Sequence, residues 1–574
     1  MTDLRPRRTA RRAQNSLLGQ GEPMVWLTGG GLVIALLMIV GLLALIVVQG
    51  VTNLWPLPVV RLTLDDGRVV MGEITREELY RPTSVQLDAL SPASARRARA
   101  EMEANGGMLR RQLVRVGNFE LTGDHFQWVD HVNVVLEERP EWAVVFERVA
   151  WGRFYGIPKA FLENGQPVAE TAEEVWRRFT ALHSTVVARR AQRRRLETRA
   201  IGAINARLEA ARLAMRAAEI RHGTASAEFA AQRRAYEQTV HEVSNAFAQI
   251  SSEIAALNAE NAKVQLIVQT GDGRTATLAL GDIVRAYPAN RLTGMGQLAV
   301  YRSRWWEFIA DEPREANSEG GVFPALFGTA VMTLLMSLAV VPFGVMAALY
   351  LREYARGGPL LSAVRIAINN LAGVPSIVFG VFGLGFFCYL IGASIDELLF
   401  AAKLPNPTFG KGGLLWASLT LALLTLPVVI VATEEALAAV PNSMREGSYA
   451  CGASRWQTIK RIVLPRAMPG IMTGMILAMA RGAGEVAPLM LVGAVKLAPE
   501  LPIDGSIPFL HLHRSFMHLG FHIYDLGFQS QNSEAAKPMV YTTTLLLIVL
   551  IFMLNVIAVQ LRTRLRRKFA SAVF

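Results

Sequence analysis

The stretch Glu446-Gly-Ser-Tyr-Ala-Cys-Gly452, which continues to Ile462-Val-Leu-Pro465, is a polar and basic segment between two long apolar segments. Its residue pattern predicts two short helices. Ser443 and Glu446 have the spacing of a capping box, in which the serine hydroxyl accepts a backbone N–H and the glutamate reaches back. Gly452 suits the left-handed position that stops the first helix. The first helix is therefore expected to end at this glycine.

The second short helix is expected to begin at Ser454, which forms another capping box with Gln457. Pro465 is expected to end it, because the residue before a proline disfavours helical geometry. We therefore expect residues 440–467 to form a helical loop between two membrane spans.

Six apolar segments are long enough to cross a bilayer, which requires about 20 residues. They are residues 24–48, 322–351, 361–391, 413–437, 469–493 and 539–561. The first is longer than the apolar part of a secretory signal and lacks a clean cleavage site, so we expect an uncleaved anchor. The predicted fold is an α-helical integral membrane protein of six transmembrane helices, an N-terminal anchor and a five-helix core within residues 322–561.

Basic residues indicate how the chain crosses the membrane. Arginines and lysines precede the first span and follow the second, fourth and sixth, and the formal net charge is +12. Alternate threading places all of these on one side, so residues 1–23, the 440–467 loop and residues 562–574 are expected to be cytoplasmic. We attribute the basic charge to these cytoplasmic segments and to their contact with anionic membrane lipid. The sequence has no basic-aromatic module, so nucleic-acid binding is not expected.

Residues 49–321 are expected to form an α+β insert on the opposite, periplasmic side. Asp65-Asp66-Gly67 and Gly271-Asp272-Gly273 each separate two apolar runs, which predicts two similar β hairpins, paired in one small unit. The chain has two cysteines, Cys388 and Cys451, in different compartments, so no disulfide is expected. The scattered histidines lack metal-ligand spacing, so no metal site is expected.

Within the insert, residues 169–262 are rich in Ala, Glu and Arg and contain no proline. Apolar residues recur there at alternating three- and four-residue steps, as in a coiled coil: Val240, Val243, Phe247, Ile250, Ile254 and Leu257. A turn at 223–226 predicts a helical hairpin. This hairpin could dock a solute-binding protein, dimerise with a sister subunit, or serve only as a structural rod.

The 446–465 loop resembles the EAA loop of ABC-importer permeases. Five stretches together resemble the A-type permease subunit of phosphate importers, namely residues 321–329, 373–380, 426–436, 446–465 and 480–488. The resemblance implies that the loop is a coupling helix that lies in a groove of a cytosolic ATPase. The residues that it implies for this contact are Glu446, Gly452, Ser454, Arg455, Trp456, Ile462, Leu464 and Pro465.

Two departures from the family pattern limit what is carried over. Gly447 and Ser448 stand where the family has two alanines, and glycine weakens a helix by up to about 1 kcal/mol relative to alanine. The long insert also exceeds the compact form of the subunit, although longer variants have one. The implied roles therefore apply to the membrane core only.

Arg481 and Glu485 are the candidate substrate residues. They are expected near the middle of the fifth span, one helical turn apart and on one face. A charged arginine at such a depth costs about 2.5–3.5 kcal/mol, so it should face a water-filled path or a partner. A guanidinium fork fits an oxyanion. The alternative is a structural ion pair between helices.

The sequence contains no P-loop, so ATP and magnesium are expected on partner subunits and no cofactor or catalytic residue on this chain. The resemblance implies phosphate import across a bacterial inner membrane, with a homologous second permease, two ABC ATPase subunits and a periplasmic phosphate-binding protein. Two alternatives remain open: another oxyanion such as molybdate, sulfate or phosphonate, or a scaffold or signalling role for the periplasmic coiled coil.

Overall fold

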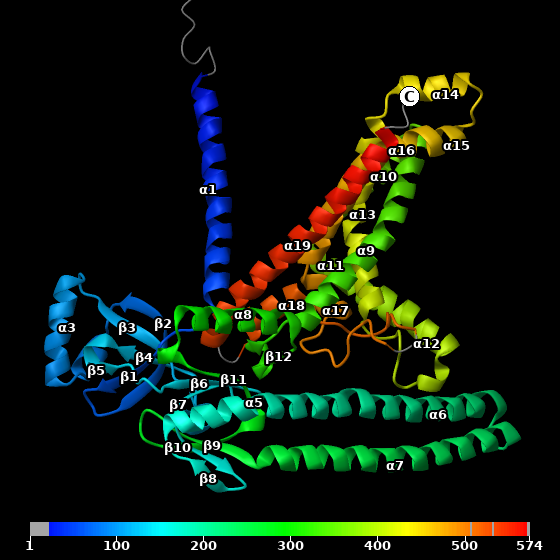
Figure 1. Ribbon diagram of the computed structural model, residues 1–574. Helices are drawn as coiled ribbons and strands as arrows, with labels where there is room; N and C mark the ends of the chain where they lie inside the picture. Colours follow the sequence, from blue (N-terminus) through cyan, green and yellow to red (C-terminus); the bar gives the residue numbers. More distant parts are fainter. Residues whose placement is uncertain (1–21, 506–507, 531–532, 571–574) are drawn as a thin grey trace, which may run out of the picture.

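The computed structural model describes residues 22–505, 508–530 and 533–570. Within these ranges, six helical segments are long and apolar enough to span a membrane: Met24–Thr52, Phe323–Tyr354, Ser376–Leu399, Leu414–Ala438, Arg455–Gly484 and Ala536–Arg564. Figure 1 shows them above a body of sheets and long helices. The predicted class, a six-helix membrane protein with an α+β insert, is confirmed.

The bounds of the third and fifth spans differ from the prediction. Residues 361–371 belong to a separate amphipathic helix, α10 (Pro359–Leu371), and the third span begins at Ser376 with α11 (Ser376–Phe382). Pro375 explains the break, because proline lacks an N–H and keeps the preceding residue out of helical geometry. This span then continues through a π-helical stretch at Gly383–Gly392 into α12 (Ala393–Leu399).

Three helices form the centre of the membrane core: α9 (Phe323–Leu349), α13 (Leu414–Ala438) and α16 (Leu464–Gly484). Glycines allow their close approach, because a Cβ on Gly344 would lie 2.6 Å from Val429 and one on Gly474 2.8 Å from Ala432. The start of α9 is fixed by Thr329, whose hydroxyl accepts the Leu519 N–H at 2.8 Å. Two short helices, α17 (Ala487–Val492) and α18 (Leu519–Tyr524), follow α16.

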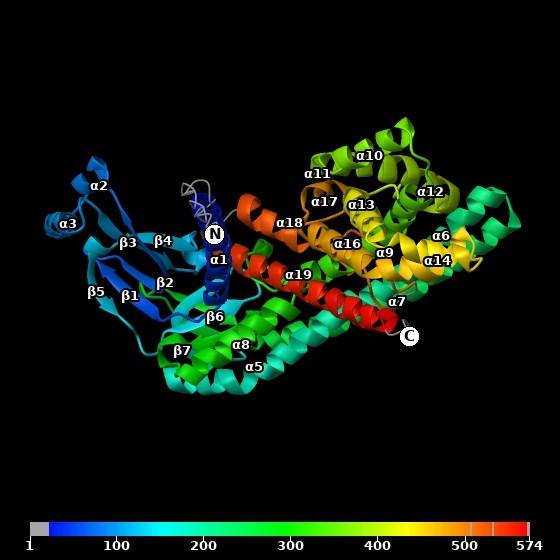
Figure 2. The ribbon, with the colours of Figure 1, turned by 90° about the horizontal axis from the view of Figure 1, so that it is seen from above.

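The first and last spans meet only near one end. Figure 2 shows α1 (Glu22–Thr52) standing apart from the core, and α19 (Ser533–Ala570) running between them. The Thr542 hydroxyl donates to the Gly50 carbonyl at 3.1 Å and accepts from the Asn53 amide at 2.9 Å. The start of α1 and the end of α19 lie on the side of the molecule that carries the 440–467 loop, and the sheets lie at the other end.

The described part of the insert contains two large antiparallel sheets and a small one of two strands, β12 (Pro313–Arg314) and β13 (Glu319–Gly320). The first has the order β4-β3-β2-β1-β5, with strands Phe126–Asp130, Leu109–Arg115, Val69–Tyr80, Val59–Leu64 and Val134–Glu138. The second has the order β10-β9-β7-β6-β11, with β8 beside β7: Thr275–Ala279, Val264–Gln269, Arg153–Glu163, Val144–Arg148, Ile283–Pro288 and Gln166–Ala169. Helices α2 (Ser84–Asp88), α3 (Pro92–Ala104), α4 (Phe119–Thr122) and α8 (Gly294–Ala310) accompany the sheets.

Both hairpins form, but they are not paired in one unit. The β1–β2 hairpin belongs to the first sheet and the β9–β10 hairpin to the second. Each turn has the same chemistry, since Arg68 pairs with Asp66 and Arg274 with Asp272, and Gly67 and Gly273 have positive φ. The sheets instead pack through a shared apolar cluster that includes Val59, Met71, Val145, Tyr155 and Tyr287. Burial of these side chains, rather than strand pairing, joins the sheets.

The predicted helical hairpin is present. It consists of α5 (Ala172–Arg195), a π-helical stretch at Leu196–Ala200, α6 (Ile201–His222) and α7 (Ala227–Ala262). Its base is fixed to the second sheet, where Val175, Phe179 and Val186 are buried. The expected seam is only partly covered, because Val243 is 8% exposed but Phe247 is 48% exposed.

The hairpin lies across the end of the membrane core that is farthest from the 440–467 loop (Figures 1 and 2). Arg194 of α5 forms an ion pair with Glu312, which precedes α9. The middle of α6 packs against Ala401–Lys403, the turn that follows the third span. Apart from its base, the hairpin therefore contacts the segment just before α9 and, in the core itself, the turn that follows the third span.

Candidate functional site

The 440–467 loop contains two short helices joined by a tight turn. The first, α14, spans Asn442–Ala450, and Gly452 follows it with φ +79°, as expected for the glycine that stops a helix. The second, α15, spans Arg455–Thr458. Its capping box is present, because Ser454 Oγ accepts the Gln457 N–H at 3.2 Å and Gln457 Oε1 accepts the Ser454 N–H at 2.9 Å.

Two features of the loop were predicted wrongly. The capping residue of α14 is Pro441 and not Ser443, because the helix begins at Asn442 and Ser443 already lies within its first turn. Pro465 does not end α15. A π-helical stretch at Ile459–Val463 leads directly into α16, and Pro465 is the second residue of that helix.

Arg445 anchors the loop to the membrane core. Its guanidinium lies 3.1 Å from Glu353 at the end of the second span, and it donates to the carbonyls of Val440 (2.6 Å) and Leu437 (2.8 Å) at the end of α13. The side chains of Arg445 and Glu353 are 12% and 8% exposed. The sequence prediction missed this pair, although Glu353 and Arg445 both lie just beyond the cytoplasmic ends of predicted spans.

Two further contacts hold the loop together. The hydroxyls of Ser448 and Thr458 lie 2.8 Å apart and link α14 to α15, which gives a reason for the departure from alanine at this position. Arg455 lies over the Tyr354 ring at 5.1 Å, a cation–π contact with the end of the second span. Gly447 has open space where a Cβ would be.

The residues expected to contact an ATPase fall into two groups. Glu446, Gly452, Ser454, Arg455 and Trp456 are exposed, and Trp456 is 59% exposed. Ile462, Leu464 and Pro465 are half-buried, and Leu464 packs against the cluster at the ends of α9 and α13. Tyr449, which is 42% exposed, extends the exposed group. We call Glu446, Tyr449, Arg455 and Trp456 the loop face.

We expect Gly452→Val to weaken the loop, whereas Gly452→Asn should retain most of its function. No atom lies within 4 Å of a Cβ at this position, so the effect comes from φ and not from a clash. A left-handed conformation costs about 1–2 kcal/mol for an ordinary residue, and asparagine adopts it more readily. Co-purification of the cytosolic ATPase measures the effect. Equal retention with valine and asparagine would contradict it.

Arg481 and Glu485 lie at the end of the fifth span and not near its middle. Arg481 is in the last turn of α16, and Glu485 follows the helix with an extended backbone. The break is explained by Pro488 in the first turn of α17. The structure nevertheless brings the two side chains together, with 3.6 Å between Arg481 Nε and Glu485 Oε1.

The Arg481 side chain points away from the packed core. It is 39% exposed, whereas the neighbouring Gly482 is buried against Met336 of α9. Leu477, one turn earlier, is 53% exposed on the same side. A basic group in the last turn is also favoured by the helix dipole. This face of α16 is thus open in a single chain, with a guanidinium at its end.

The second half of the chain is similar to known transport permeases. Residues 340–567 match the model of the family described as binding-protein-dependent transport system inner membrane component. The phosphate transport system permease protein PstA 1 of Mycobacterium tuberculosis is 35% identical over 47% of this chain and 80% of its own length. A probable ABC transporter permease of Bacillus subtilis, YqgH, is 35% identical over 40% of this chain and 68% of its own.

Among solved structures, the MetNI methionine ABC transporter in an inward-facing conformation matches with a TM-score of 0.31 and 19% identity, over 42% of this chain and 94% of that chain. The spans and the loop define a multi-pass membrane permease. The chain belongs to the binding-protein-dependent transport system inner membrane component family, and it is an inner-membrane permease subunit of an ABC importer.

Proposed function

We propose that this permease imports inorganic phosphate. The observation that carries the proposal is the exposed Arg481 guanidinium beside Glu485, on a face of α16 that no other part of the described chain covers. A guanidinium binds an oxyanion by paired charge-assisted hydrogen bonds. Glu485 would orient this guanidinium and accept a hydrogen bond from a protonated phosphate oxygen. This favours hydrogen phosphate over anions that carry no proton. The naming of the Mycobacterium tuberculosis relative as a phosphate permease supports this substrate.

In the proposed complex, a homologous second permease covers the open face of α16, and the pathway runs between the two subunits. Two cytosolic ATPases bind ATP and magnesium and contact the loop face. A periplasmic phosphate-binding protein delivers the substrate to the end of the core that carries the sheets. The loop and both termini then lie in the cytoplasm.

The test is uptake of labelled phosphate by cells or vesicles that contain the whole transporter. Excess unlabelled phosphate should abolish the labelled uptake, whereas molybdate, sulfate and phosphonate should reduce it little. Stronger competition by one of those anions would assign that anion as the substrate. The assay therefore separates the oxyanions without any change to the protein.

The helical hairpin supports a scaffold role as a second candidate, because it contacts Glu312 just before the core and the core itself at Ala401–Lys403. The pair between Arg207 and Glu242 fixes which residues face each other across its two arms. Removal of residues 200–249 and closure with a short glycine linker would therefore shorten the hairpin and leave its buried base intact.

We expect the shortened protein to retain phosphate uptake, because Arg481 and the loop face are unchanged. Uptake rate, together with its repression at high external phosphate, measures the effect. Retained uptake with lost repression would add a signalling role for the hairpin. Abolished uptake in a fully assembled complex would contradict the expectation and place the hairpin in the transport path.

A further inference from the structure

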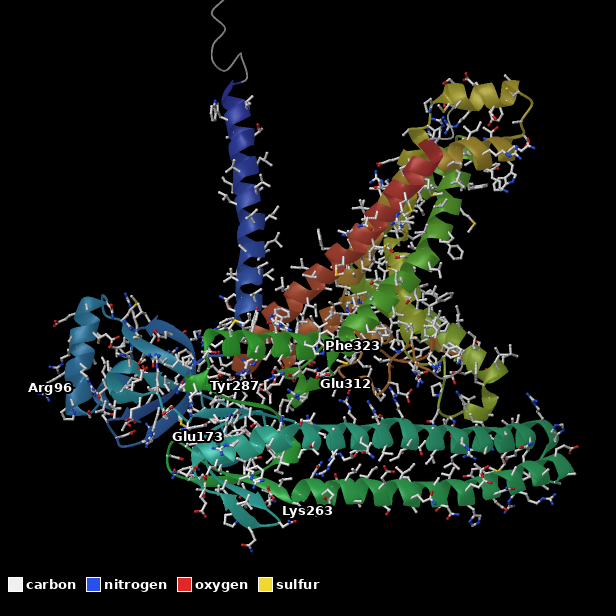
Figure 3. The ribbon with its side chains drawn as sticks, viewed as in Figure 1. Arg96, Glu173, Lys263, Tyr287, Glu312 and Phe323 are labelled. Carbon is white, nitrogen blue, oxygen red and sulfur yellow. The ribbon has the colours of Figure 1, made fainter. Side chains whose placement is uncertain are left out.

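A cavity of about 630 Å³ lies where the insert meets the ends of α1 and α19. Its walls come from both sheets, from α8, from the segment 314–320, and from the first turns of α19. Trp55 and Tyr541 also line it, and such aromatic residues gather at the membrane–water interface. In Figure 3, Tyr287 marks this junction beneath α8, and Arg96 lies far from it. The cavity therefore lies at the insert-side ends of the first and last spans, where a lipid head group could reach it.

The inner wall carries more arginines than glutamates. Glu147 accepts from Arg304 (2.6 Å) and Arg285 (2.5 Å), and Glu307 is shared by Arg285 (2.7 Å) and Arg314. In all, five arginines surround four glutamates: Arg115, Arg153, Arg285, Arg304 and Arg314, with Glu73, Glu147, Glu307 and Glu319. One positive charge is left over.

Glu147 remains ionised within this wall. Burial alone would raise the pKa of its carboxyl, but Arg304, Arg285 and Arg153 outweigh burial and hold the pKa well below its usual range. The Nε atom of Arg314 is buried and has no hydrogen-bond partner among the described residues. Oε1 of Glu307 likewise has no hydrogen-bond partner among the described residues, so the wall presents unbalanced charge, an unused donor and an unused acceptor.

The rim adds a second unbalanced charge. Glu534 at the start of α19 is shared by Arg76 of β2, at 3.4 Å, and Lys537, at 2.7 Å. Arg76 also lies 3.6 Å from Glu78, which Arg111 already pairs, so three cations share two carboxylates where the insert meets the membrane helices. The lining as a whole contains seven basic and five acidic side chains.

We propose that this cavity binds a phosphate group, either of a lipid head group or of free inorganic phosphate. Unbalanced charge is costly in the inner wall, where the five arginines are only 4–18% exposed, and an anion offsets it. Guanidinium groups bind phosphate oxygens in pairs, and lysine adds a point charge. The bound phosphate joins Arg76 of the insert to Lys537 of α19. This site lies on residues other than Arg481 and Glu485, so it is separate from the proposed transport path.

The test uses full-length protein purified in detergent and stripped of lipid. One arm titrates short-chain phosphatidylglycerol and follows the bound lipid by native mass spectrometry. The other arm titrates inorganic phosphate by calorimetry, in the Arg481→Ala background, so that binding in the transport path does not contribute. We expect Arg76→Gln with Lys537→Gln to weaken binding by about tenfold in at least one arm.

The matched control is Arg96→Gln with Arg110→Gln, which removes the same charge from exposed positions of the same insert outside the cavity. A third variant, Glu534→Gln, removes the carboxylate between the two cations and should strengthen binding, so a folding defect cannot imitate the result. An effect in the lipid arm alone assigns a lipid site, and an effect in the phosphate arm alone assigns an inorganic anion. Unchanged binding in the rim variants, or equal loss in the control, overturns the proposal.

Discussion

Arg481→Ala should abolish phosphate uptake and leave assembly and basal ATP hydrolysis intact. The Arg481 side chain lies at the end of α16, pairs with Glu485 and is 39% exposed, so its loss should disturb little of the packed core. Without the Arg481 guanidinium, the transported oxyanion has no paired hydrogen-bond donors at this position. Uptake of labelled phosphate and ATP hydrolysis by the purified complex measure the two properties separately.

Two variants sharpen this prediction. Arg481→Lys keeps the charge but loses the planar fork, so uptake should fall without disappearing. Arg564→Ala, at the exposed end of α19, removes the same charge without touching the proposed path and should leave uptake unchanged. Normal uptake in Arg481→Ala would exclude a substrate role and favour a structural pair with Glu485.

Arg445→Ala should uncouple the permease from its ATPase. This change leaves Glu353 buried without a cation and frees the carbonyls at the end of α13. Breaking a buried pair by removal of one partner costs about 3–5 kcal/mol. We expect a lower melting temperature, weaker ATPase co-purification, and loss of both uptake and transport-stimulated ATP hydrolysis.

The control for this change is Arg352→Ala, which removes an exposed arginine next to Glu353 and should be nearly neutral. Combining Arg445→Met with Glu353→Gln removes both charges and should recover stability relative to Arg445→Ala alone. If Arg445→Ala and Arg352→Ala behaved alike, the pair would not anchor the loop.

Features set by neighbouring residues could be predicted from the sequence. Gly452, the Ser454–Gln457 capping box and both Asp-Gly turns depend on local backbone geometry, and each is present. The six spans could also be counted, because membrane crossing depends on length and apolarity.

Features set by distant residues could not be predicted. Arg445 and Glu353 are 92 positions apart, and neither has a sequence pattern that names its partner. The two hairpins have similar turns, but their sheet partners are determined by the whole insert. Pro465 looked like a helix end because the π-helical stretch before it leaves no clear mark in the sequence. Because the fifth span begins earlier in the chain than predicted and ends at Gly484, Arg481 lies in its last turn and not near its middle.

The continuity of the fifth span has a mechanical consequence. The fifth span runs without interruption from Arg455 in the loop to Gly484 beside Arg481. At 1.5 Å per residue, its 30 residues form a rod of about 45 Å. A tilt or rotation of the helix at Arg455 would therefore also move its other end, at Arg481 and Gly484. The π-helical stretch at Ile459–Val463 lies within this helix, and the break after Gly484 ends it just beyond Arg481.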